Sequence, residues 1–422
     1  MEKNQTDENS LIFLYDHVQV GNGFVKESPE LVYEVSNSVP HLESLGFVIQ
    51  KEPLEKASEF STMGLYVIEL SQIYRVCEYG IHRLISQKAL NLAKSGKIRI
   101  VFWGATEGGN IIDGGLLKES ERVIKSWKLP LKPFFIYGDL RVQEKAKKNE
   151  LESLFFCPVD YWGPSYQHQM KEKWKEESVL KIEKPIHTLE KKKYDFLCYN
   201  ANPKSHRLAL IAELKRKGLD KNSLISLVGR SYAEQGFIDN LNAMAFFNST
   251  HPEFKKISKN IEKYKKNIEY MYLDQNLDSI EEAHGDRRQQ SNHYEQSFFS
   301  FVTESTLESE VLFPTEKVFK PLLNEHPFIV YGSPGLLGYL RSLGFETFPE
   351  FFDESYDEKL DQRDRLEIIL ESVTQFCNLP IEEKRNLLSS ASEKLVHNSE
   401  HFKKIKFKDN YNIVIENLRG KI

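Results

Sequence analysis

Residues 297–343 constrain the fold of this chain more than any other stretch. An apolar run at 298–302 is followed by Pro-Thr-Glu-Lys at 314–317, which opens a segment with helical spacing. A second apolar run at 327–331 ends in Gly-Ser-Pro-Gly at 332–335, and another helical segment follows. This order of strand, helix, strand and helix predicts a parallel sheet, whose ligands bind where strands end and helices begin.

Apolar runs and helical segments alternate along most of the chain, which favours parallel α/β structure. Further strands are predicted at Leu11–Tyr15, Phe47–Gln50, Tyr66–Leu70, Ile98–Trp103, Pro133–Tyr137, Leu154–Cys157, Tyr194–Tyr199 and Leu224–Val228. Helices are predicted at Glu78–Ser95, Met170–Val179, Lys204–Lys217, Arg363–Phe376 and Ile381–Phe402. Because 422 residues exceed one ordinary core, we expect two Rossmann-like α/β domains, residues 1–185 and 186–422.

Composition narrows the function classes. The chain is 40% hydrophobic and 28% charged with a net charge of −5, which argues against a general nucleic-acid binder. No apolar run approaches the roughly 20 residues that span a bilayer, and the polar start is unlike a signal peptide. The four cysteines are scattered without a CxxC pair, as in a reducing compartment. We therefore expect a cytoplasmic protein, with peripheral contact at the inner membrane face left open.

The motifs of residues 190–350 resemble those of a known enzyme group. An acidic residue and Ser after a strand, then Thr-Glu-Lys opening a helix, then a strand ending in Tyr-Gly-x-Pro, are similar to the nucleotide-sugar half of α1,3-fucosyltransferases and exostosin-like glycosyltransferases. The resemblance implies the GT-B architecture, in which two Rossmann-like domains face a cleft. It implies a GDP- or UDP-sugar donor, no bound cofactor, and a glycan or glycolipid hydroxyl as acceptor, as in surface polysaccharide synthesis.

A nucleotide-sugar site needs cations or N–H groups near the diphosphate, where negative charge grows as the glycosidic bond breaks. The resemblance assigns Arg207 and Lys317 to the diphosphate, with Lys204 as a rival cation. It assigns Glu316 to the ribose. From position alone, Lys317 could instead be a surface lysine and Glu316 an ordinary carboxylate at a helix start.

The remaining donor-site candidates have structural explanations as well. Thr315 is a good helix N-cap, and Asn200 can shape the turn in which it lies. Ser333 lies in a tight turn before a helix, where it can offer a contact to the diphosphate. Glu304 occupies the place of the family's glutamate on the nucleoside side, although Phe313 stands where the fucosyltransferases have a tyrosine.

The catalytic base is expected from the first domain. Glu107, which follows the apolar run Ile98–Trp103 in a glycine-rich loop, is the first candidate, and Asp16 and His17 are the runners-up. Asp113 is a weaker choice, and a retaining enzyme would need no such base. No Asp-x-Asp or HExxH motif occurs, so we expect metal-independent chemistry.

Three alternatives remain open at the level of sequence. The chain could be another nucleotide-sugar enzyme, such as an epimerase, that needs no acceptor. It could be a protein-modifying glycosyltransferase with a peptide acceptor. It could also be a non-catalytic α/β binding scaffold, in which case it would bind no nucleotide.

Overall fold

A computed structural model describes much of the chain. The described residues are 10–15, 19–20, 24–25, 42–43, 45, 47–60, 62–69, 85–106, 108, 116–176, 189–200, 204–226, 291–407, 411 and 416. The chain divides into two compact units. One comprises Met1–Glu176, Glu310–Thr315 and Ile405–Ile422, and the other comprises Glu177–Ser309 and Glu316–Lys404. The last two segments of the first unit belong, by sequence, to the predicted second domain.

The first unit is built on a parallel sheet with the strand order β4-β1-β5-β6-β7-β8. These strands are β1 (Ser10–Tyr15), β4 (Val48–Pro53), β5 (Gly64–Glu69), β6 (Ile98–Gly104), β7 (Phe134–Tyr137) and β8 (Phe155–Pro158). Around it lie a short antiparallel pair, β2 (Gln19–Val20) and β3 (Phe24–Val25), the 3-10 helix η1 (Leu54–Ser58), and the helices α4 (Gln87–Lys94), α5 (Leu116–Ser126), α6 (Val142–Lys148) and α7 (Trp162–Glu176).

The central strands of this first sheet are buried on both faces, whereas the edge strand β4 is partly exposed. Neighbouring residues of β6 enter different hydrophobic clusters, Phe102 on one face and Trp103 on the other. Burial on both faces explains why β1 and β7 are continuous apolar runs rather than alternating ones.

Residues 310–315 are attached to the first unit by hydrogen bonds and by packing. The amide of Leu312 donates to Oδ1 of Asp139 at 2.9 Å, and the amide of Leu140 donates to the carbonyl of Leu312 at 2.8 Å. The ring of Phe313 lies so close to Gly108 that a Cβ at that glycine would be 1.9 Å from Cγ of the ring. Phe313, which the motif resemblance placed in the donor half, therefore packs on Gly108 after β6.

The end of the chain also completes the first unit. Tyr411 is buried within the cluster that contains Trp103, and its hydroxyl donates to the carbonyl of Asp160 at 2.7 Å. The side chain of Gln167 on α7 donates to the carbonyl of Ile405 at 3.0 Å. The first unit thus takes core residues from the last part of the sequence.

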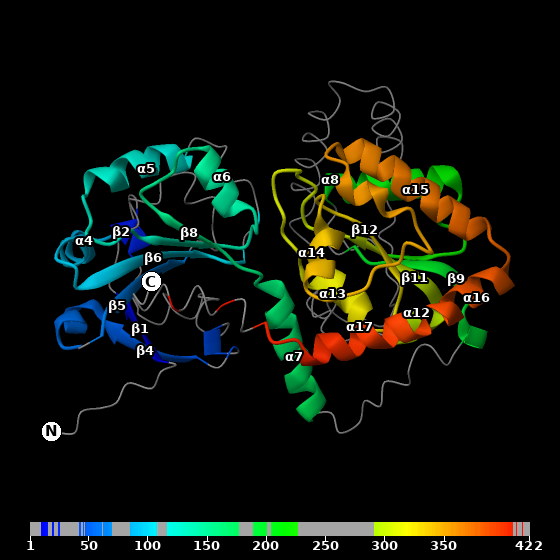
Figure 1. Ribbon diagram of the computed structural model, residues 1–422, viewed down its shortest axis with the longest axis horizontal. Coiled ribbons are helices and arrows are strands. Elements are labelled where there is room, and N and C mark those ends of the chain that lie inside the picture. The colour runs from blue at the N-terminus through cyan, green and yellow to red at the C-terminus, as the bar shows by residue number, and fades with distance from the viewer. Residues whose placement is uncertain are drawn as a thin grey trace. The chain divides into compact units, whose positions relative to one another are not determined.

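The second unit is built on a parallel sheet with the order β10-β9-β11-β12. These strands are β9 (Tyr194–Cys198), β10 (Leu224–Ile225), β11 (Ser297–Thr303) and β12 (Phe328–Tyr331). Its helices are α8 (Ser205–Lys217), α12 (Ser291–Gln296), α13 (Glu316–Leu323), α14 (Leu336–Ser342), η4 (Glu354–Glu358), α15 (Gln362–Asn378), α16 (Ile381–Ser390) and α17 (Ser392–Lys404). Figure 1 shows α8 and α15 on one side of this sheet and α13 and α17 on the other.

The predicted fold class, with a parallel α/β sheet in each half, is confirmed. The single helix predicted over 381–402 is wrong, because the chain forms α16 and α17 with a break at Ala391. The helix predicted from residue 170 begins eight residues earlier, at Trp162. Helices α5, α6 and α12 were not predicted.

A buried polar network lies at the edge of the second sheet where β11 begins. Lys192, which is 4% exposed, donates through Nζ to the carbonyls of Tyr294 at 2.9 Å and Ser297 at 2.7 Å. His326 contacts the carbonyl of Ser297 through Nε2 at 2.8 Å and the hydroxyl of Ser300 through Nδ1 at 2.8 Å. Burial lowers the pKa of Lys192 to about 7, despite an opposing effect of Glu295.

A buried ion pair ties α16 to the second sheet. Nζ of Lys384 lies 2.6 Å from Oδ1 of Asp195 on β9, and both side chains are less than 10% exposed. The same ammonium donates to the carbonyl of Cys377 at 2.7 Å. Among the helices in the described parts of the chain, none has the length and hydropathy to cross a bilayer.

Candidate functional site

The predicted donor-site residues gather at the carboxyl edge of the second sheet. Asn200 follows β9, Glu304 follows β11 and Ser333 follows β12, while two helices begin at the same edge. The residues at those helix starts are Lys204 and Arg207 for α8, and Thr315, Glu316 and Lys317 for α13. The edge forms in this way because parallel strands all end on one side and short connections lead into the next helix.

The loop after β11 is held by cationic side chains that bind its carbonyl oxygens. Arg207, which is 2% exposed, donates through Nη2 to the carbonyls of Thr303 and Glu304, both at 3.3 Å. Arg365 on α15 donates through Nη2 to the carbonyl of Leu307, and through Nη1 to two carbonyls near the end of η4. The motif resemblance had assigned Arg207 to the diphosphate, whereas its guanidinium here donates to backbone carbonyls of the protein.

Two lysines from different helices converge on Ser305. Nζ of Lys204 donates to the carbonyl of Ser305 at 2.8 Å, and Nζ of Lys317 donates to its hydroxyl at 3.3 Å. Lys317 also lies 3.2 Å from Oε1 of Glu316 and is one-quarter exposed. Two ammonium groups that bind the same residue repel each other, so a bound anion would stabilise the arrangement.

Glu316 is ionised in this setting. Burial alone would raise its pKa, but Lys317 and then Lys320 outweigh burial, so the pKa of Glu316 lies below its ordinary value. Its carboxylate is therefore available to accept hydrogen bonds. A carboxylate in the first turn of α13 is also favoured by the helix dipole.

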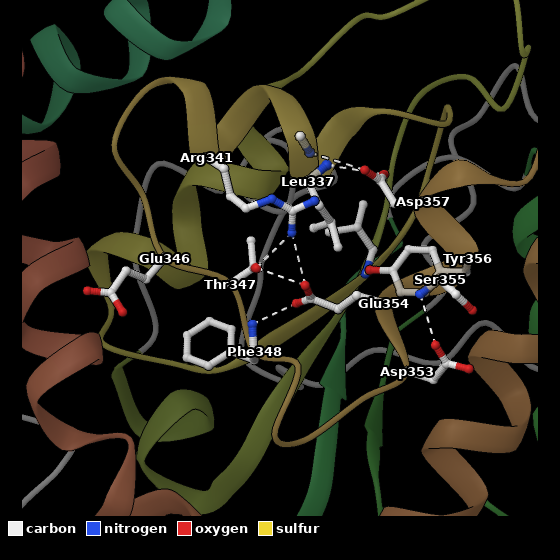
Figure 2. A network of polar contacts seen from close by, with 12 residues as sticks. Leu337, Arg341, Glu346, Thr347, Phe348, Asp353, Glu354, Ser355, Tyr356 and Asp357 are labelled. Carbon is white, nitrogen blue, oxygen red and sulfur yellow. Dashed lines mark hydrogen bonds and ion pairs between the residues drawn. The ribbon is translucent and has the colours of Figure 1, made fainter.

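The helix after β12 does not offer its N-terminus to a ligand. The carboxylate of Asp357 accepts hydrogen bonds from the amides of Leu337 and Gly338, both at 3.1 Å (Figure 2). A protein carboxylate thus occupies the start of α14, where the sequence motif had suggested a phosphate contact. The hydroxyl of Ser333 is buried and makes no hydrogen bond to any residue that the structure describes.

Asp357 is fixed in this position by a second carboxylate on η4. Figure 2 shows Glu354 accepting from Arg341 Nη1 at 3.0 Å, from the Thr347 hydroxyl at 2.8 Å and from the Phe348 amide at 2.7 Å. The hydroxyl of Tyr356, between the two acids, accepts from the amide of Val330 on β12 at 3.1 Å. These bonds anchor η4 and hold Asp357 at the start of α14.

The start of α8 differs from those of α13 and α14. Lys204 is its N-cap residue, no described side chain caps the helix, and its first turn has no acidic residue. The positive end of its dipole therefore adds to the charges of Lys204 and Arg207. Of the helix starts at this edge that the structure describes, this one is the best suited to an anion.

Sequence analysis did not identify His206, which lies between Lys204 and Arg207 in the site. Its Nε2 is 2.9 Å from the carbonyl of Glu304, and its ring meets Tyr331 edge-on with centroids 6.2 Å apart. Burial, followed by the charge of Arg207, lowers its pKa to about 3. Its position next to Arg207 at the helix start was the one sequence signal for a role in the site. Its hydrogen bond could not be predicted, because the partner lies in the loop after β11.

Asn200 has a structural role at this edge. Its side-chain Oδ1 accepts from the hydroxyl of Thr303 at 2.7 Å, and its backbone N–H donates to the hydroxyl of Ser226 at 3.2 Å. The residue is 1% exposed. Asn200 therefore joins the ends of β9, β10 and β11.

The candidate catalytic residues Glu107, Asp16 and His17 lie outside the described residues, as does Asp113. Their roles stay predictions. Among the residues that are described, there is no group of three or more His, Cys, Asp or Glu side chains that could hold a metal ion.

Comparison with known proteins yields only distant structural matches. No protein-family model matches the chain, and no curated protein matches its sequence. The N-terminal domain of Candida albicans trehalose-6-phosphate phosphatase matches with a TM-score of 0.42 and 9% identity, covering 99% of this chain and 98% of that one. An α,α-trehalose 6-phosphate synthase from Burkholderia multivorans gives 0.40 and 8%, covering 87% and 74%. Another trehalose-6-phosphate synthase gives 0.37 and 8%, covering 97% and 99%. At such low scores, the fold assignment rests on this chain's own sheet topology.

Proposed function

We propose that this chain is a glycosyltransferase that takes its sugar from a nucleoside-diphosphate donor bound at the carboxyl edge of the second sheet. The observation that carries the proposal is the convergence of Lys204 and Lys317 on Ser305, beside the start of α8, which no described side chain caps. Two cations and a helix N-terminus at one point suit a ligand with two adjacent phosphates. The motif resemblance to α1,3-fucosyltransferases gives that role to Lys317 and Arg207, with Lys204 as the rival cation.

The chemistry assigned to the site follows from these charges. As the bond between the sugar and the diphosphate breaks, negative charge grows on the leaving phosphate, and Lys204 and Lys317 stabilise it. The ionised Glu316 accepts hydrogen bonds from ribose hydroxyls. Arg207 acts by holding the β11 loop through the carbonyls of Thr303 and Glu304, and its charge adds to the field at the phosphates.

The rest of the proposal comes from the family resemblance. The donor is a GDP- or UDP-sugar, and the acceptor is a hydroxyl of a glycan or glycolipid. Glu107, with Asp16 and His17 as alternatives, would accept the proton of that hydroxyl if the reaction inverts configuration. No resident metal is proposed.

Thermal melting of the purified chain with GDP, UDP, CDP and dTDP tests the donor site. A diphosphate present at 100 times its dissociation constant should stabilise the protein by about 2.7 kcal/mol. The Lys204→Ala and Lys317→Ala variants should lose this shift. Lys217→Ala is the matched control, because Lys217 is an exposed residue in the last turn of α8, and it should keep the shift. If no diphosphate stabilises the wild-type chain, the proposed function is wrong and the scaffold alternative gains support.

The acceptor requires a second assay. The nucleotide sugar whose diphosphate binds should release that diphosphate faster when a glycan or glycolipid acceptor is added. Release without an acceptor would favour an epimerase-like or hydrolytic enzyme, and release that needs a peptide would favour protein modification.

A further inference from the structure

His206 occupies a part of the candidate site in which most side chains only donate hydrogen bonds. Lys204 and Arg207 flank it on α8, and Lys317 approaches from α13. Lysine and arginine side chains have no acceptor. A nucleotide sugar, however, carries hydroxyl groups as well as phosphates, and those hydroxyls need acceptors.

The tautomer of His206 is set by its hydrogen bond to the backbone. The partner of Nε2 is the carbonyl oxygen of Glu304 at 2.9 Å, and a carbonyl can only accept, so Nε2 carries the proton. Protonation at Nδ1 as well would add a third positive charge beside those of Lys204 and Arg207, which is unfavourable. With a pKa lowered to about 3 by burial and by Arg207, the ring stays neutral at neutral pH.

It follows that Nδ1 of His206 carries a lone pair. No described residue donates a hydrogen bond to this nitrogen, and the side chain is only partly buried, so a ligand can reach it. The two nearby carboxylates each have one oxygen that already contacts the protein. Oε2 of Glu304 accepts from the amide of Ser305 at 3.1 Å, and Oε1 of Glu316 faces Lys317.

We propose that Nδ1 of His206 accepts a hydrogen bond from a hydroxyl group of the bound sugar nucleotide. The inference rests on the proposed donor site and adds a specificity-determining residue to it. The hydroxyl belongs either to the ribose or to the sugar that is transferred, and the ligands of the test distinguish the two. A ligand without that hydroxyl would leave Nδ1 without a donor.

Two substitutions separate the roles of the two ring nitrogens. His206→Gln places an amide nitrogen near the position of Nε2, so it keeps the donor to the Glu304 carbonyl and loses the Nδ1 acceptor. His206→Asn places its amide near Nδ1, so it keeps an acceptor there and loses the donor to Glu304. The first variant should reduce ligand affinity, and the second should mainly lower the melting temperature.

The test is calorimetric titration of wild type and both variants with the nucleoside diphosphate that stabilises the chain, with its 2′-deoxy and 3′-deoxy forms, and with the corresponding nucleotide sugar. His206→Gln should bind the hydroxylated ligand about fivefold to tenfold more weakly. A loss already seen with the diphosphate assigns the contact to the ribose, and then one deoxy form should bind wild type and His206→Gln equally. A loss seen only with the nucleotide sugar assigns it to the sugar.

Two results would overturn this inference while leaving the donor site intact. One is that His206→Gln binds every ligand as wild type does, while Lys317→Ala does not. The other is that His206→Asn loses as much affinity as His206→Gln. That result would mean that the ring affects binding only by holding the loop after β11. If wild type binds no diphosphate at all, the donor site itself is refuted, and the inference falls with it.

Discussion

Replacing Arg365 by methionine removes a buried guanidinium that joins three parts of the second unit. Arg365 is 1% exposed, and it donates to the carbonyls of Lys359 at 2.7 Å, Leu360 at 2.8 Å and Leu307. Leu307 lies in the loop after β11, which contains the donor-site residues Glu304 and Ser305. The substitution keeps much of the apolar stem and removes every donor.

The magnitude follows from the carbonyls that lose their partner. The buried bond to Leu307 leaves an unsatisfied acceptor that costs about 1–3 kcal/mol, whereas each part-buried bond to Lys359 and Leu360 contributes about 0.5–1.5 kcal/mol, so independent losses would total about 2–6 kcal/mol. Part of this is offset because the variant no longer buries a charge, and neighbouring losses are not additive. We expect a loss of about 3–5 kcal/mol for Arg365→Met, or roughly 10 °C in the melting temperature of a unit of this size.

The assay is scanning calorimetry of Arg365→Met beside Arg363→Met on the same helix. Among the described residues, Arg363 makes ion pairs with the exposed side chains of Asp364 at 3.5 Å and Glu367 at 3.8 Å, and its loss should cost less than about 1 kcal/mol. Arg365→Lys should fall between the two, because one ammonium cannot reach all three carbonyls. If Arg365→Met melts within 2 °C (about 1 kcal/mol) of Arg363→Met, the bonds from Arg365 do not stabilise the unit and this reasoning is refuted.

Three further predictions concern stability. Gly108→Ala should destabilise the first unit by about 1–3 kcal/mol, because its Cβ would overlap the ring of Phe313. In urea denaturation, adding Phe313→Leu should restore part of the lost free energy of unfolding. No gain in stability from the second substitution would contradict the packing. For Lys192, the folded-state pKa of about 7 lies below the unfolded value, so the free energy of unfolding should rise by about 1 kcal/mol per pH unit between pH 7 and 10. This rise should be smaller in Lys192→Met. Equal slopes in the two proteins would refute the prediction. Lys384→Met leaves Asp195 buried without its cation and should cost about 3–5 kcal/mol of stability. The double variant Asp195→Asn/Lys384→Met should lose less stability. An equal or greater loss in the double variant would count against the ion pair.

Local sequence was sufficient to predict the strands of the two parallel sheets and the edge at which the candidate site lies, but not the short strands β2 and β3. Buried parallel strands are continuous apolar runs, and the residues that follow them must meet at one edge. Glu304 and Lys317 were therefore placed correctly relative to the sheet without any knowledge of tertiary contacts. The break at Ala391 was missed because the periodic pattern of 381–402 continues across it.

The contacts within the edge could not be predicted in the same way. Asp357 caps α14 from a segment about twenty residues further on, and only the fold of η4 brings its carboxylate to the amides of Leu337 and Gly338. Arg365 and His206 bind carbonyls of the β11 loop, and any residue type has a carbonyl, so no sequence pattern marks these partners. Arg207 illustrates the same limit, since a cation at a helix start is compatible with a ligand and with the backbone.

The position of Tyr411 has a consequence for synthesis on the ribosome. Multidomain chains generally fold from the N-terminus as each domain emerges. Here the cluster that contains Trp103 also contains Tyr411, and residues 310–315 bind Asp139 and Gly108. The unit that is translated first is therefore completed last, after the whole of the other unit has left the exit tunnel. A nascent chain halted before residue 405 should carry an incomplete first unit, and this unit should become resistant to protease only once residue 411 has left the exit tunnel.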